Sequence, residues 1–371
     1  MPQRNDVNWE AIRIIVETST GSPLEKRLML PRLIKAVKKH GIQSLTPQFR
    51  YSYCAARLSL GDFSDYFGWE YRNYKEDDPS THWSAVLYHN ETWLPKWGGG
   101  FVNTLLILGE QGVGDAIFFA SIIPEAMIRV KQVIYECDDR LHKLLERSLP
   151  GLVCHSEVPF EQRREGDAYI PAAELMRMFR RSHTHFPAKP FLKPNPERLS
   201  EFQQYKGRIG ISWRARQGSI DPLKLGIKGL SLQYGEQHPE IESPHIDLKD
   251  DLDGVVTLCS VLDRVVTVPT SVHHFAAGVG TKVEIIAPEV IGEPNQIPWD
   301  YPLPDNAEFH KLPWYKDATV FLNIDTWRDY AQRNESRKDV RGHAQGRYGQ
   351  GQSSQNSSSQ NAQIVNDRQS A

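Results

Sequence analysis

The chain has 371 residues, of which 39% are hydrophobic and 10% aromatic, and its formal net charge at pH 7 is -2. This length allows two domains, each with a core of its own. The near-neutral charge gives no reason to expect nucleic acid as a partner, because binding to a phosphate backbone needs many Lys and Arg side chains.

The cysteine pattern and the N-terminal sequence also indicate the cellular compartment. The four cysteines (Cys54, Cys137, Cys154 and Cys259) form no C-x-x-C pair, which favours reduced thiols over a zinc site or a disulfide framework. The N-terminus lacks the apolar segment of a signal peptide, and no stretch reaches the ~18 apolar residues of a membrane helix. We therefore expect a cytoplasmic protein without a transmembrane segment.

The first part of the chain, residues 1–98, is predicted to be a helical, repeat-like region followed by a linker. The stretches "WEAIRIIVE" and "LEKRLMLPRLIKAVKKHG" place apolar residues three and four positions apart, and "YSYCAARLSLGDFSDYFGWEYRNY" is typical of a single helical-hairpin repeat. The polar, Trp-rich segment that ends in "KWGGG" indicates the linker.

Short apolar runs then alternate with helical patterns. The runs "NTLLILG", "KQVIYEC", "RIGISW", "KGLSLQ", "DRVVTV" and "KVEIIAP" are typical of parallel strands buried on both faces, and "DAIFFASIIPEAMIRV" and "DRLHKLLERSL" of the helices between them. We predict an α/β fold of two Rossmann-like, doubly wound domains, at residues 99–200 and 201–332, that face each other across a cleft. The polar tail, residues 333–371, has too little apolar surface to offset the entropy of ordering and is predicted to be disordered.

A glycine-rich turn joins the first strand of this region to its first helix. In "LILGEQGVGDAIFFA", Gly109, Gly112 and Gly114 allow backbone N–H groups to approach a ligand, and the following helix N-terminus favours negative charge. The stretch is neither a P-loop nor a dinucleotide fingerprint. Asp115 lies at the helix start, where the spacing leaves two interpretations open: a helix cap or a chemical group.

A second strand, turn and helix occur in "DRVVTVPTSVHHFAAGVG". Thr270 or Ser271 is expected to cap this helix, and His274 falls opposite its apolar stripe, where we expect an outward-facing imidazole. Two hydroxyls, a helix N-terminus and an imidazole suit a diphosphate, although an ordinary capped helix with solvated histidines fits the same pattern.

Two further residues follow strands at the edge where open α/β sheets bind ligands. Arg214 follows "RIGISW" and suits a phosphate or a surface ion pair, and Gln233 ends "GLSLQ" and suits a base or ribose. The D-x-D pair of Asp251 and Asp253 precedes a helix, which favours capping acids over a metal site. The "HTH" at His183 lies in a polar loop and is assigned no chemistry.

The ordered motifs resemble a known family: the glycosyltransferase-like region of bacterial tetratricopeptide-repeat proteins, which is related to the lipopolysaccharide heptosyltransferases. They run from about Leu58 to Trp327 and are "LGDFSDYFGWEYR", "KWGGG", "LILGEQGVGD", "DAYIP", "FPAKPFL", "IGISWR", "LSLQYGE" and "TVPTSVHHFAAGVGTKV". The resemblance implies a GT-B fold with the active site between two Rossmann-like domains. It also implies transfer of a sugar from a nucleotide-sugar, the co-substrate, to an acceptor hydroxyl on a glycan, lipid or protein, with no metal and no cofactor.

The resemblance assigns roles to residues as well. Asp115 matches the acid expected to act as general base, and Thr270, Ser271 and His274 match the segment that holds the donor diphosphate. The chain departs from the family at Pro269, where an acid is usual, and in a shorter segment before "KGLSLQ". These departures favour an alternative, in which the same fold serves as a catalytically inactive nucleotide-sugar-binding or scaffold protein.

Overall fold

The computed structural model describes residues 34–35, 37–39, 94–109, 112–156, 167–215, 218–287 and 309–334. Residues 34–35 and 37–39 are helical, but the rest of the predicted N-terminal helical region lies outside the described residues. Of the tail predicted to be disordered over 333–371, residues 333–334 are instead helical, and the part from residue 335 lies outside the described residues. The chain up to Trp327 belongs to one compact unit and the remainder to a second. The predicted boundaries between domains remain predictions.

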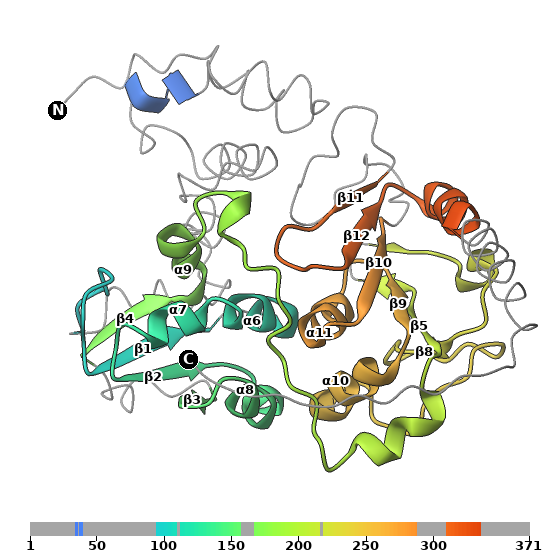
Figure 1. The fold of residues 1–371 in the computed structure, drawn as a ribbon, viewed down its shortest axis with the longest axis horizontal. Helices are drawn as coiled ribbons and strands as arrows, with labels where there is room; N and C mark the ends of the chain where they lie inside the picture. Colours follow the sequence, from blue (N-terminus) through green and yellow to red (C-terminus); the bar gives the residue numbers. More distant parts are fainter. Residues whose placement is uncertain are drawn as a thin grey trace, which may run out of the picture. The chain divides into compact units, whose positions relative to one another are not determined.

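The first half of the described fold is a four-stranded parallel sheet in the order β3-β2-β1-β4 (Figure 1). Its central strand β1 carries the apolar run "TLLIL", which the sequence predicts to be buried on both faces. The strands are β1 (Thr104–Leu108), β2 (Gln132–Glu136), β3 (Leu152–His155) and β4 (Ala168–Pro171), and the helices are α6 (Val113–Ala120), α7 (Ile123–Met127), η2 (Asp139–Leu141), α8 (His142–Ser148), α9 (Ala172–Phe179) and η4 (His183–His185).

The single helix predicted over "DAIFFASIIPEAMIRV" is wrong, because the structure divides it into α6 and α7. Pro124 lies at the start of α7 and has no N–H to continue the bonding of a preceding helix. The Ser121 hydroxyl donates to the Phe118 carbonyl at 2.6 Å and so gives this carbonyl, near the C-terminal end of α6, a hydrogen-bond partner. The break gives α6 its own short axis directly after the glycine turn.

The second sheet has six strands in the order β11-β12-β10-β9-β5-β8, and β11 alone runs antiparallel to its neighbour. The sequence predicts β5, β8, β9 and β10 but not the β11–β12 pair. The elements are η5 (Leu199–Tyr205), β5 (Ile209–Ser212), β6 (Arg214–Ala215), β7 (Gly218–Ser219), η6 (Pro222–Leu225), β8 (Leu230–Ser231), α10 (Leu252–Val261), β9 (Arg264–Thr267), α11 (Ser271–Val279), β10 (Lys282–Ile286), β11 (Phe309–Lys311) and β12 (Ala318–Phe321). The β6 and β7 strands form a separate two-stranded hairpin.

Direct helix packing joins the two sheets. Helix α6 packs against α11, and α8 packs against α10, with side chains from both sheets in one apolar cluster (Figure 1). A Cβ placed on Gly114 would lie 3.1 Å from the His274 Cδ2 atom and 3.3 Å from the Ser271 Cα atom. Gly114 therefore lets the first turn of α6 approach the first turn of α11 closely.

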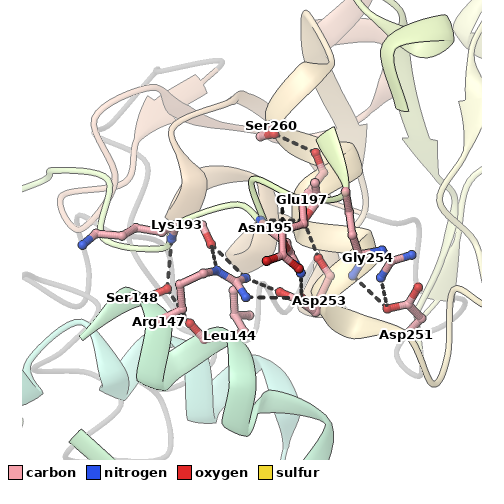
Figure 2. A network of polar contacts seen from close by, with 12 residues as sticks. Leu144, Arg147, Ser148, Lys193, Asn195, Glu197, Asp251, Asp253, Gly254 and Ser260 are labelled. Carbon is pink, nitrogen blue, oxygen red and sulfur yellow. Dashed lines mark hydrogen bonds and ion pairs between the residues drawn. The ribbon is translucent and has the colours of Figure 1, made fainter. Parts of the chain in front are cut away.

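A polar network ties α8 to α10 beside this contact (Figure 2). The Arg147 guanidinium on α8 forms an ion pair with Asp253 on α10 and donates to the Lys193 carbonyl at 3.1 Å. The Asn195 amide donates to the same Asp253 carboxylate at 3.0 Å. Asp251 caps α10, since its carboxylate accepts from the Gly254 N–H at 2.9 Å. The D-x-D acids thus serve as helix cap and ion-pair partner, and the Asp253 side chain is 15% exposed.

Replacing Arg147 by Met is expected to lower the free energy of unfolding by about 2 kcal/mol, because it leaves the Asp253 carboxylate with one amide donor in a poorly solvated place. The measurement is urea unfolding of the full chain, read from the midpoint at constant slope. The control is Arg208→Met, which removes the more exposed pair with Glu242 and is expected to cost under about 1 kcal/mol. Equal losses in the two variants would contradict a special role for the network.

Candidate functional site

The glycine turn lies at the carboxyl end of β1, as the sequence predicts. Gly109 follows the strand and packs tightly against β2. A Cβ at this position would lie 2.1 Å from the Glu136 carbonyl oxygen, so only glycine fits here. Gly112 is the N-cap of α6, with an extended backbone and no side-chain cap. Gly114, predicted to be part of the turn, instead lies inside the first turn of α6. Residues 110–111 lie outside the described residues.

Asp115 occupies the first turn of α6 and is half-buried. The interpretation of Asp115 as the N-cap is wrong, because Gly112 holds that position and its carbonyl accepts the first helical bond from the Ala116 N–H at 2.8 Å. The Asp115 carboxylate turns back toward the helix start, since a Cβ placed on Gly112 would lie 3.2 Å from its Oδ2 atom. The carboxylate therefore lies where free N–H groups give the helix a partial positive charge.

Helix α11 begins at the carboxyl end of β9 in the same way. Thr270 is its N-cap, and its hydroxyl accepts a hydrogen bond from the Val272 N–H at 3.3 Å. Of the two residues expected to cap, the structure thus selects Thr270, and Ser271 is the first helical residue. Both are half-buried, and Ser271 lies against Gly114 of α6. The start of α11 thus lies close to the start of α6.

The expected outward imidazole of His274 is wrong. His274 is 5% exposed, because α6 covers the side of α11 that its own sheet leaves free. Its Nδ1 atom lies 2.8 Å from the Tyr315 hydroxyl, and its ring lies 5.9 Å from that of Phe118 on α6. Burial, together with the adjacent His273, holds the pKa of His274 well below its usual range. The imidazole is therefore neutral at pH 7.

Arg214 and Gln233 lie together at the neighbouring strand ends. The Gln233 side-chain oxygen accepts from the Ser212 hydroxyl at 3.2 Å and from the backbone N–H groups of Trp213 at 3.2 Å and Arg214 at 2.9 Å. Gln233 is therefore engaged within the chain and shapes the segment after β5. The exposed Arg214 guanidinium pairs with Glu236 at 3.1 Å, which fits the surface ion pair considered for it.

These residues form two groups at one sheet edge. In the pairing of β5 with β9, Ser212 lies opposite Thr267, so the segments that lead to Arg214 and to Thr270 leave neighbouring strands in the same direction. Contacts bring Gly114, Ser271 and His274 together, and a separate set of hydrogen bonds brings Arg214 and Gln233 together. Ligand binding by either group remains a prediction.

Within the described part of the chain, no group of three or more His, Cys, Asp and Glu side chains is placed to hold a metal ion. No helix in the same residues is long and apolar enough to cross a membrane. Cys137, Cys154 and Cys259 are free and buried, whereas Cys54 lies outside the described residues.

Sequence reasoning missed the aromatic and imidazole groups around His274. The ring centroids of His273 and His274 lie 3.8 Å apart, and those of Trp314 and Phe118 lie 5.4 Å apart. Tyr315 and Trp314 belong to the loop between β11 and β12, whose strands carry no strong sequence signal. Only the adjacent histidine pair was visible in the sequence.

Comparison with known proteins gives partial similarities. No protein-family model matches the chain. Protein FlbA of Caulobacter vibrioides is 27% identical over 239 residues, which are 51% of this chain and 40% of FlbA. The chain thus spans less than half the length of this curated relative.

The solved structures that resemble the chain include heptosyltransferases. ADP-heptose lipopolysaccharide heptosyltransferase II of E. coli matches 62% of this chain and 98% of its own, with 13% identity and a TM-score of 0.41. The E. coli heptosyltransferase WaaC, solved with ADP-2-deoxy-2-fluoro heptose, matches 62% and 99%, with 10% identity and a TM-score of 0.37. A glycosyltransferase family 9 protein of Veillonella parvula matches 49% and 80%, with 9% identity and a TM-score of 0.35. At these identities and TM-scores the similarities establish no shared activity.

Proposed function

We propose that the chain is a metal-independent glycosyltransferase that moves a sugar from a nucleotide-sugar to an acceptor hydroxyl on a glycan, lipid or protein. The observation that carries the proposal is the contact between the starts of α6 and α11, through Gly114, Ser271 and His274. A carboxylate lies on one of these helix starts, and two hydroxyls and an imidazole lie on the other. Glycosyl transfer needs such a pair: a base for the acceptor and neutral or positive donors for the departing diphosphate.

The proposed step uses the two helix starts on opposite sides of the sugar. Asp115 takes the proton of the acceptor hydroxyl as its oxygen forms a bond to the anomeric carbon. The bond from that carbon to the donor diphosphate breaks, and the electron pair leaves with the phosphate oxygen. The positive end of the α11 helix dipole, the Ser271 hydroxyl and the His274 imidazole then stabilise the added negative charge.

Arg214 and Gln233 have supporting roles in this proposal. Arg214 is exposed at the neighbouring strand end, so exchange of its Glu236 partner for a phosphate costs little. Gln233 keeps the Arg214 backbone in place through its own side-chain oxygen. We propose that Arg214 contacts the donor and that Gln233 orients the segment which carries Arg214.

A second function, an inactive nucleotide-sugar-binding or scaffold protein on the same fold, is favoured by two observations. Pro269 lies in the turn between β9 and α11, where the family that the sequence resembles usually has an acid. In addition, a Cβ placed on Gly114 would lie only 3.3 Å from the Ser271 Cα atom, so a ligand that binds between the helix starts has to separate them. Such a protein would bind the donor, or a partner, without turnover.

One experiment separates the two functions. The purified full chain is incubated with a panel of nucleotide-sugars and glycan, lipid and protein acceptors, and release of nucleoside diphosphate is measured with and without a chelator. Acceptor-dependent release that survives chelation supports the transferase. Donor binding in calorimetric titrations without release from any acceptor supports the binding protein. Release that the chelator abolishes contradicts metal independence.

A further inference from the structure

The Tyr315 hydroxyl reaches His274 from the loop between β11 and β12. Tyr315 is 2% exposed, and its oxygen lies 2.8 Å from the His274 Nδ1 atom. Burial raises the pKa of the Tyr315 hydroxyl, so the phenol keeps its proton at any physiological pH. The pair is therefore a neutral phenol beside a neutral imidazole.

The direction of this hydrogen bond follows from the partners of Tyr315. Among the described residues, the Nδ1 atom of His274 is the hydrogen-bond partner that the structure gives to the Tyr315 hydroxyl. If Nδ1 carried the imidazole proton, it would donate to Tyr315, and the phenol proton would be buried without an acceptor, at a considerable cost. Tyr315 is thus the donor and Nδ1 the acceptor. The proton of the neutral imidazole then lies on Nε2.

The Nε2 side of the ring is the side that faces α6. The Cδ2 atom, which is bonded to Nε2, lies 3.1 Å from a Cβ placed on Gly114. The His273 ring packs against the His274 ring and helps to fix its plane. The ring consequently has Tyr315 on one edge and the first turn of α6 on the other.

We propose that Tyr315 is a positioning residue that fixes His274 as the Nε2-protonated tautomer, so that His274 donates a neutral hydrogen bond to a diphosphate bound between the starts of α6 and α11. This inference rests on the proposed function for its ligand, but not for its tautomer. It goes beyond the roles predicted for Thr270, Ser271 and His274, because it makes a residue of a distant hairpin loop set the chemistry of the site. An uncharged donor also lets diphosphate leave without first having to break an ion pair with the imidazole.

The test reads the tautomer directly, by two-bond ¹H–¹⁵N spectra of the imidazoles in the ¹⁵N-labelled full chain. His274→Gln assigns the signals of His274 by their loss. We expect the pattern of an Nε2–H tautomer in the unmodified chain and a mixture of both tautomers in Tyr315→Phe. The matched control is Tyr205→Phe, which removes a buried phenol that lies elsewhere, beside the His245 backbone.

Inorganic pyrophosphate, titrated into the same variants, tests the ligand. We expect Tyr315→Phe to weaken pyrophosphate binding about tenfold and Tyr205→Phe to leave it unchanged. His274→Gln keeps an N–H near the Nε2 position, whereas His274→Asn has its amide near Nδ1, so we expect the Gln variant to bind more tightly than the Asn variant.

The tautomer, the diphosphate ligand and the transferase activity are each decided by a different outcome. An Nδ1–H pattern in the unmodified chain overturns the inference, as does a Tyr315→Phe variant with an unchanged spectrum and unchanged pyrophosphate affinity. The expected tautomer without pyrophosphate binding overturns the diphosphate as the ligand. The expected tautomer with pyrophosphate binding, but without turnover of any nucleotide-sugar, leaves the inference standing and overturns the transferase.

Discussion

Asp115→Asn should reduce sugar transfer by about 10²- to 10⁴-fold while donor binding stays within a few-fold of the unmodified chain. General base catalysis contributes on that scale, and a neutral amide cannot take the proton from the hydroxyl of the sugar acceptor at neutral pH. The substitution is nearly isosteric, and Asp115 is half-buried in the first turn of α6, so the packing of Ala116 and Phe118 on the core side of the helix is retained. The loss should fall on kcat and not on the KM of the donor.

The measurement is nucleoside diphosphate release under steady-state conditions, with the donor and acceptor identified by the panel. Asp139→Asn is a matched control, because Asp139 is an exposed acid at the start of η2 and its removal changes the net charge equally. Equal rates for Asp115→Asn and the unmodified chain would remove Asp115 from the mechanism. A loss confined to the KM of the donor would make Asp115 a binding group.

The strands that the sequence predicts best are those with the longest apolar runs. Parallel strands buried on both faces are apolar at consecutive positions, which is why β1, β2 and β10 stand out against the helices around them. The β11 strand carries "FHK" at a sheet edge, where one side of the strand has no partner to bury it. Edge strands carry little apolar signal, and β11 was missed for this reason. The β12 strand lies inside the sheet and is buried, but its run "ATVF" is short, and a short apolar run does not distinguish a strand from a helix segment by periodicity.

The same contrast holds for the candidate site. The glycine turn and the cap at Thr270 are local features, because a strand, a tight turn and a helix start occupy only a few consecutive residues. The environment of His274 is not local. Helical spacing tells which side of α11 faces its own sheet, but the opposite side is covered by α6 and by Tyr315, which lies 41 residues away in the sequence. A helical pattern does not show whether the second face is solvated or buried.

The buried histidine pair should make the chain unstable in mild acid. Burial lowers the pKa of His273 to about 4 from an ordinary value of 6.5, and it lowers the pKa of His274 as well. Because both pKa values are lower in the folded state, the unfolded chain binds more protons below pH 6.5, and the free energy of unfolding falls as pH falls. The contribution of His273 is complete above about pH 6.5 and is lost progressively as pH falls through about 4, for a total of about 3 kcal/mol.

This loss is measured by urea unfolding at a series of pH values between about 4 and 7.5, where each such histidine adds up to about 1.4 kcal/mol per pH unit to the slope. His273→Phe keeps an aromatic ring against His274 and removes one titrating group, so its curve should be flatter than that of the unmodified chain over this window. The matched control is His245→Gln, which removes an exposed imidazole outside the buried pair. Parallel curves for His273→Phe and the unmodified chain would contradict the lowered pKa of His273, because a group with the same pKa in both states adds nothing to the slope.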